Sequence, residues 1–221
     1  NKLTPIVVYE GRGGVLHSNN TRRNGIILNT DIADYVLYKL GYLTECAVLE
    51  LDEKASLNAL EDMNMSILRT SVLRAPVLTY YAVSVIAALG MLFAAAVFFG
   101  KKCGHFWFGT GIIIAYTMLL IPIAFLLIPA SCQDWGPVGY AILTAAVSFV
   151  LSILLHLSLR NRLKTILVIC LLLQAGLAVD ILTGSELIKK SVLGYDPIIG
   201  ARFYGIGNEY AGMFIGISLM V

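Results

Sequence analysis

The sequence predicts a mainly α protein, in which a polytopic helical membrane domain follows the α/β tail of a soluble domain. Of its 221 residues, 58% are hydrophobic and 14% are charged, whereas a soluble domain carries about 25% charged residues. No charged residue occurs between Val77 and Phe99, and a helix of that length crosses the roughly 30 Å hydrocarbon core of a bilayer. The residues before this run are mixed and polar, and those after it are mostly apolar.

The N-terminal segment alternates short apolar runs with turn residues. Residues 3–9 form a β-branched run that predicts a strand, and residues 26–28 form a second short run. Residues 29–31 offer side-chain oxygens that could cap a helix ending at Gly41. Two strands and one helix are too few to enclose a core. We therefore expect residues 1–41 to be the C-terminal tail of a larger α/β domain, and the chain to be a fragment.

The runs Thr4–Tyr9, Thr21–Ile26 and Asn29–Gly41 resemble the C-terminal end of alkaline-phosphatase-superfamily domains. This superfamily includes sulfatases, cofactor-independent phosphoglycerate mutases and phosphoethanolamine transferases, and its members end in a helix of the pattern T-D-I-A-P-T-hydrophobic-L-x-x-L-G. Here Asp34 and Tyr35 stand where that pattern has Pro and Thr. The resemblance covers about forty of the 221 residues and marks fold rather than catalysis.

The resemblance implies an extracytoplasmic enzyme that hydrolyses or transfers phosphate or sulfate esters. It implies a Ser or Thr nucleophile and a divalent metal, zinc or manganese. In the superfamily these groups precede the tail, so we expect them before Asn1 and expect no catalytic residue or metal ligand within the chain. His17 is a lone histidine, which we interpret as a polar loop residue, and we interpret Asp31 as a helix cap.

Residues 42–75 are expected to form an acidic linker and then an amphipathic connector helix. From Leu57 onward, apolar residues recur at three- and four-residue steps. Arg69 and Arg74 precede the first apolar run. They could contact lipid phosphates or could belong to a packed connector.

Residues 76–221 are expected to be the membrane domain of a multi-pass protein of the cell membrane. Asp180 and Gln174 are polar residues within one span, where they could mark a functional site, or Asp180, near the outer end, could simply reach water. Cys170 is interpreted as a small hydrophobic residue. Cys46 and Cys132 could form a disulfide, but the sequence does not show whether they lie close enough. The spans are expected near residues 77–99, 108–129, 138–157 and 165–183, with a truncated span from 211.

The basic residues of the short loops set an orientation. Lys101 and Lys102 occupy one loop, and Arg160, Arg162 and Lys164 another, whereas residues 131–135 contain neither Lys nor Arg. By the positive-inside rule the first two loops are cytoplasmic. Residues 1–75 and 184–210 are then extracytoplasmic.

Residues 194–210 combine glycines, tyrosines and charges just before the last apolar run. We expect them to bind the polar head of a phosphate-bearing lipid or lipid-linked sugar, or else to form a loop that only packs and caps. Asn208 could cap the following helix, whose N-terminus favours an anion, and Arg202 could hold a phosphate through two hydrogen bonds. The candidate substrate-binding residues are Asp196, Arg202, Tyr204, Asn208 and Glu209.

Two functions are considered, the first because the resemblance implies it. The first is the membrane-anchored phosphatase-type enzyme, and the second is a transporter or a lipid-linked glycan assembly protein with a non-catalytic soluble appendage. A transporter predicts ionisable residues deep inside several spans. The expected partners are the lipid bilayer and a lipid-linked or anionic substrate. Nucleic acid is not expected, because the net charge is +2 and no basic-aromatic stripe occurs.

Overall fold

The computed structural model describes residues 4, 6–9, 13–21, 25–43, 49–53, 56–99, 105–130, 135–196, 198 and 206–219. The chain divides into two compact units. The first comprises Asn1–Leu68 and Tyr195–Gly205, and the second comprises Arg69–Gly194 and Ile206–Val221.

The first unit contains a two-stranded antiparallel sheet and a helix. Strand β1 (Val15–Ser18) pairs with β2 (Leu49–Asp52), so that Val15 lies opposite Asp52. Helix α1 (Asn29–Lys39) follows β1, and its chain leaves through Gly41 in the left-handed region (φ 79°). This glycine supports the predicted end of the helix, because the left-handed conformation costs glycine little.

The strand expected at residues 3–9 is not formed where the structure describes that run. Residues 6–9 have no regular secondary structure, and Val7 and Tyr9 are 92% and 95% exposed. Residues 26–28 are not a strand either, although Ile26 is buried. A β-branched run becomes a strand only beside a hydrogen-bonding neighbour, and in this unit β2 pairs with residues 15–18 instead.

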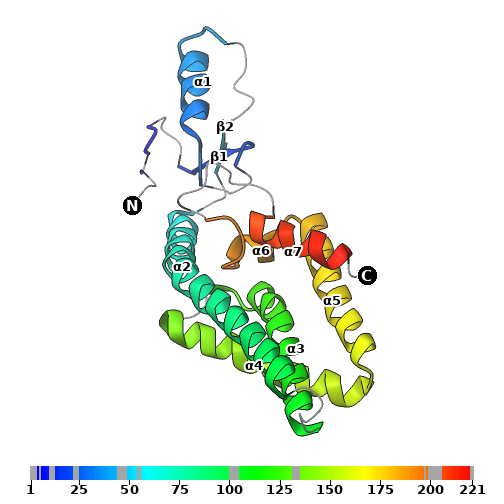
Figure 1. Ribbon diagram of the computed structural model, residues 1–221. Coiled ribbons are helices and arrows are strands. Elements are labelled where there is room, and N and C mark those ends of the chain that lie inside the picture. Colours follow the sequence, from blue (N-terminus) through cyan, green and yellow to red (C-terminus); the bar gives the residue numbers. More distant parts are fainter. Residues whose placement is uncertain are drawn as a thin grey trace. The chain divides into compact units, whose positions relative to one another are not determined.

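Helices dominate the rest of the described chain (Figure 1). Helix α2 runs unbroken through Pro76, so that the expected connector and the first apolar run form one helix, which continues as a π-helical turn, η1. The elements are α2 (Leu57–Ala94), η1 (Ala95–Phe99), α3 (His105–Leu127), α4 (Gly136–Leu159), α5 (Arg162–Leu182), α6 (Glu186–Lys190) and α7 (Asn208–Ser218).

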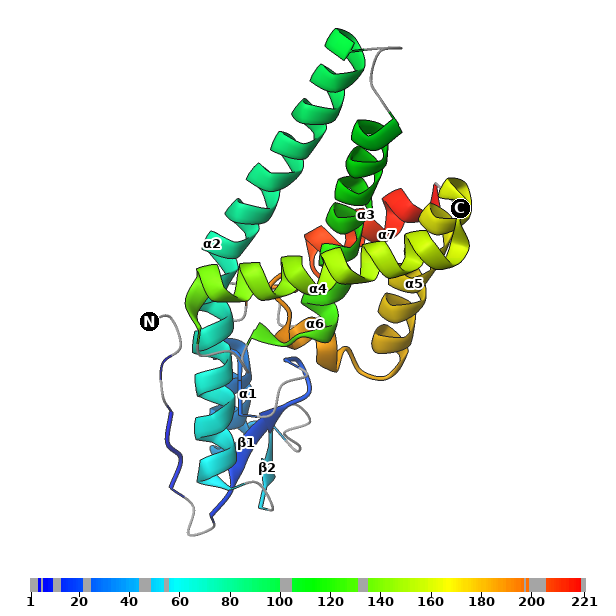
Figure 2. The same cartoon turned by 90° about the horizontal axis from the view of Figure 1, so that it is seen from below.

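Four helical stretches are long and apolar enough to cross a membrane, which confirms the mainly helical, membrane-type fold class. They are Leu57–Val97, Gly109–Leu127, Gly136–Leu159 and Arg162–Leu182. Figure 2 shows α4 crossing the direction of α2 and α3 obliquely. The alkaline-phosphatase-like tail stays a prediction.

The core of the second unit forms where α2, α3, α4 and α5 meet the α6 segment and α7. Phe125 of α3 stacks on Tyr140 of α4 at a ring-centroid distance of 5.9 Å and meets the ring of Tyr81 from α2 edge-on at 5.7 Å. Leu177 of α5 and Tyr210 of α7 are fully buried in the same cluster. Residues far apart in the sequence thus share one core.

Helix α4 has a polar inner face and an apolar outer face. Its buried residues are Tyr140, Thr144, Ser148 and Ser152, which are spaced four apart and therefore share one side of the helix. The Ser152 hydroxyl lies 3.1 Å from that of Thr117 on α3. The opposite side leaves large apolar side chains exposed, among them Val138, Ile142, Phe149, Leu154 and Leu157.

Candidate functional site

Asp180, near the end of α5, holds the short helix α6. Its two carboxylate oxygens accept the backbone N–H groups of Leu187 and Ile188, each at 2.9 Å. The chain turns back between them through Gly184 (φ 107°) and Ser185 (φ 62°). Asp180 is 3% exposed, so the alternative that it simply reaches water is wrong. The returning chain covers the carboxylate and supplies the hydrogen bonds that water would otherwise make.

Arg74 of α2 joins three segments of the second unit. Its guanidinium donates to the carbonyl oxygens of Val192 (3.1 Å) and Gly194, and it pairs with the Glu209 carboxylate of α7 at 2.5 Å. The side chains of Arg74 and Glu209 are 14% and 35% exposed. Of the two alternatives for Arg74, the structure therefore supports the packed one, because its donors are directed at protein acceptors.

Tyr210 of α7 connects the segment that follows α6 to helix α3. Its side chain is fully buried, and its hydroxyl lies 2.8 Å from the Ser191 hydroxyl and 3.4 Å from the carbonyl oxygen of Pro122 on α3. The Ser191 hydroxyl also accepts the Leu193 N–H at 3.3 Å. Residues 187–194 are thus held at Asp180, at Arg74 and at Tyr210, and we call this segment with its three anchors the anchored loop.

The five candidate binding residues have different outcomes. Glu209 joins the anchored loop through Arg74. Asn208 is the first residue of α7 rather than its cap, because Gly207 occupies the N-cap position at φ 79° and no side chain caps the helix. Asp196 lies in the first unit and accepts the Ile198 N–H at 2.8 Å. Arg202 and Tyr204 lie outside the described residues.

Asp31 caps α1, as the sequence predicts. Its carboxylate accepts the Leu28 N–H at 2.9 Å, the Ser18 hydroxyl at 2.6 Å and the Asn20 amide at 2.7 Å. Burial raises the pKa of this carboxyl, but the hydrogen bonds, with one from Thr30, together outweigh that effect and leave the pKa below its usual value. His17 lies in β1 rather than in a loop. Across the described residues, no three His, Cys, Asp or Glu side chains gather closely enough to hold a metal ion.

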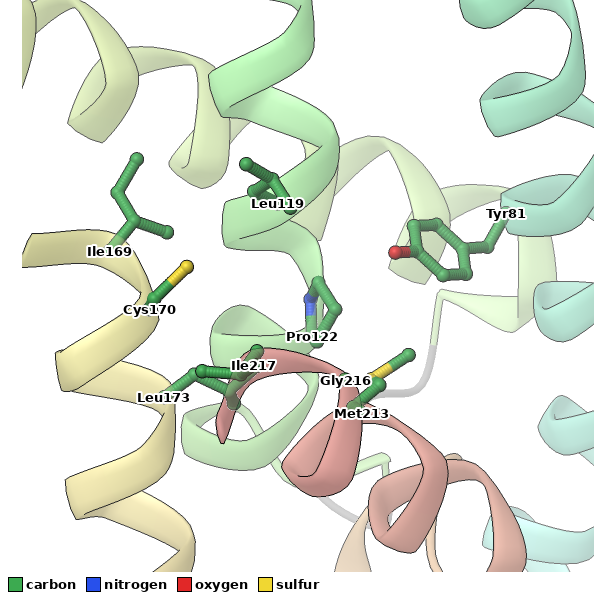
Figure 3. Close-up of a pocket in the computed structure, with 9 residues that line it drawn as sticks. All are labelled: Tyr81, Leu119, Pro122, Ile169, Cys170, Leu173, Met213, Gly216 and Ile217. Atoms are coloured by element: carbon green, nitrogen blue, oxygen red, sulfur yellow. The ribbon is translucent and has the colours of Figure 1, made fainter. Parts of the chain in front are cut away.

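A cavity of about 240 Å³ lies in the second unit, between α2, α3, α5 and α7 (Figure 3). Figure 3 shows the Cys170 sulfur pointing from α5 toward α3, while Met213 and Ile217 approach from α7. The Tyr81 hydroxyl donates to the Met118 carbonyl oxygen at 3.1 Å. The lining residues are Tyr81, Leu119, Pro122, Ile169, Cys170, Leu173, Met213, Gly216 and Ile217.

The anchored loop and the cavity meet along α7. Glu209 and Tyr210 lie one helical turn before Met213, and Pro122 both accepts the Tyr210 hydroxyl and lines the cavity. A polar cluster, whose groups are bonded within the protein, therefore adjoins an apolar space. Sequence reasoning missed Arg74 as an anchor, although an arginine beside an apolar run signals a need for acceptors.

No protein-family model, no curated protein and no solved structure matches this chain.

Proposed function

We propose that this chain is the membrane-embedded part of an enzyme that hydrolyses or transfers phosphate or sulfate esters, and that it presents a lipid-linked substrate. The observation that carries the membrane part is the polarity of α4, which buries Thr144, Ser148 and Ser152 and exposes Phe149 and Leu154. In water this arrangement would be reversed, because apolar surface is driven inward. In lipid it is favourable, since small hydroxyl-bearing residues let helices approach closely, and the Ser152 hydroxyl contacts that of Thr117 on α3.

The soluble part of the proposal rests on α1 and on the resemblance of its sequence. On α1, Val36 and Leu37 are 47% and 41% exposed, and Leu40 just beyond it is 65% exposed. An apolar face of this kind is a surface that further protein would cover. This supports a larger α/β domain, to which the nucleophile and the divalent metal would belong.

The transporter alternative has less support. Among the described residues the buried acids are Asp31 and Asp180. Both carboxylates are engaged as helix caps, whereas a proton or ion relay needs groups that can exchange their partners.

Activity of the full-length protein in proteoliposomes tests the proposal. It should release phosphate or sulfate from a generic aryl ester, and a chelator should abolish the release until zinc or manganese is restored. Arg202→Ala should abolish activity on a lipid-linked ester and leave thermal stability nearly unchanged. Absence of metal-dependent ester cleavage would refute the enzyme, and loss of stability with activity per folded molecule retained would make residues 194–210 scaffolding.

Orientation is tested separately, in intact cells that express a variant without its native cysteines. A membrane-impermeant maleimide should label Gln133→Cys and leave Asn161→Cys unlabelled. Asn161 lies between α4 and α5, beside Arg160 and Arg162, so it reports the basic loop that the positive-inside rule places in the cytoplasm. The reverse labelling would contradict an extracytoplasmic catalytic domain.

A further inference from the structure

The cavity between α2, α3, α5 and α7 has walls that suit hydrocarbon better than water. An ordered water needs two to four polar partners. The Tyr81 hydroxyl already donates to Met118, and the Cys170 thiol is a weak donor. The other lining side chains are apolar, among them Leu119, Leu173 and Ile217.

The position of the cavity is at bilayer depth. Cys170 lies about 12 Å from the start of α5 and about 18 Å from its end, at 1.5 Å per residue. Helix α5 is itself long and apolar enough to cross a membrane. Gly216, on the α7 side, is exposed, so the cavity opens toward the medium that surrounds the helices.

The volume of the cavity fits a single hydrocarbon chain. An apolar cavity of about 150 Å³ holds one benzene molecule, and pockets for drug-sized ligands begin at about 300 Å³. At about 240 Å³ this cavity admits a segment of one hydrocarbon chain.

We propose that this cavity binds an acyl chain of a membrane lipid, with the polar head of the lipid toward the anchored loop. Met213 begins the cavity one turn after Glu209, which pairs with Arg74, so polar groups stand at the end where a headgroup would lie. The inference rests on the proposed function only in treating this lipid as the substrate. Binding is therefore measured without turnover.

Two glycines of α7 provide a matched pair of variants. A Cβ added at Gly216 or at Gly212 would meet no atom within 4 Å, so the helix tolerates a side chain at either position. Gly216 lines the cavity, and Gly212 is not among the lining residues. Gly216→Leu fills the cavity from its open side, and Gly212→Leu places the same side chain on the same helix outside it.

The experiment uses the full-length protein in vesicles that contain a phosphatidylglycerol with a photoactivatable diazirine in one acyl chain. We expect crosslinks in the peptides that contain Cys170 and Met213. Gly216→Leu should reduce them at least about tenfold, which corresponds to roughly two methylene groups displaced from an apolar site. Gly212→Leu should leave them unchanged.

A second readout is alkylation of Cys170 by a lipophilic maleimide in detergent, which added phosphatidylglycerol should slow in the unmodified protein and in Gly212→Leu. Equal crosslinking in the two variants would overturn the proposal, and so would crosslinks from this cavity to another protein segment instead of the lipid. Lipid binding without ester cleavage would refute the enzyme and leave the binding site standing.

Discussion

Removing the Arg74 guanidinium should loosen the anchored loop more than any other single change to its ion pair. In Arg74→Met the carbonyl oxygens of Val192 and Gly194 and the Glu209 carboxylate all lose a donor. Breaking a fully buried pair costs about 3–5 kcal/mol. Because the Glu209 side chain is 35% exposed, water partly solvates the carboxylate, and we expect a loss of about 2–3 kcal/mol in the free energy of unfolding.

Two further variants show whether the loss has this cause. Glu209→Gln keeps both carbonyl contacts of Arg74 and leaves an amide oxygen as an acceptor, so it should cost about 1 kcal/mol or less. The double variant Arg74→Met, Glu209→Leu removes both charges and should be less destabilised than Arg74→Met alone, since no carboxylate is then left unpaired.

The assays are denaturant unfolding of the purified protein in detergent and hydrogen exchange of the peptide that contains Leu193. Arg74→Met should raise exchange in that peptide, because the neighbouring carbonyls no longer hold the chain to α2. The reasoning fails if Arg74→Met costs no more than Glu209→Gln, or if the double variant is destabilised as much as Arg74→Met alone or more.

Asp180→Asn should lower the free energy of unfolding by about 1–3 kcal/mol, because an amide accepts the Leu187 and Ile188 N–H groups through one oxygen instead of two. The control is Glu186→Gln, at an exposed side chain on the same short helix, which should change the free energy of unfolding by less than about 0.5 kcal/mol. Because the pKa of Asp31 is lowered from 3.8 in the folded chain, its stabilisation is present above that pH and is lost as pH falls through the lower folded value. Hydrogen exchange of the α1 peptide should therefore rise below about pH 4 and show less pH dependence in Asp31→Asn. Gly207→Ala should lower the free energy of unfolding by about 1–2 kcal/mol, because Gly207 has φ 79°. Gly212→Ala, inside α7, should raise it by up to about 1 kcal/mol. Equal effects of the two changes would contradict the positive φ at the N-cap of α7.

The helices could be predicted from the sequence alone. Charge-free runs long enough to cross a bilayer, such as the one before Phe99, can satisfy their backbone hydrogen bonds internally only as helices, and the structure places a helix over each expected span. The capping role of Asp31 was also local, because a carboxylate at the third position of a helix reaches back to an N–H three residues earlier.

The contacts between polar residues, in contrast, depend on how the helices and loops pack. Asp180 is separated by seven residues from the N–H of Leu187, and Arg74 by 135 residues from Glu209, and no periodicity in the sequence encodes either contact. The failed strand at residues 6–9 has the same origin, because a strand depends on a distant partner for its hydrogen bonds. The cavity beside Cys170 is likewise a property of four helices together, since its volume depends on how their side chains pack and not on any one of them.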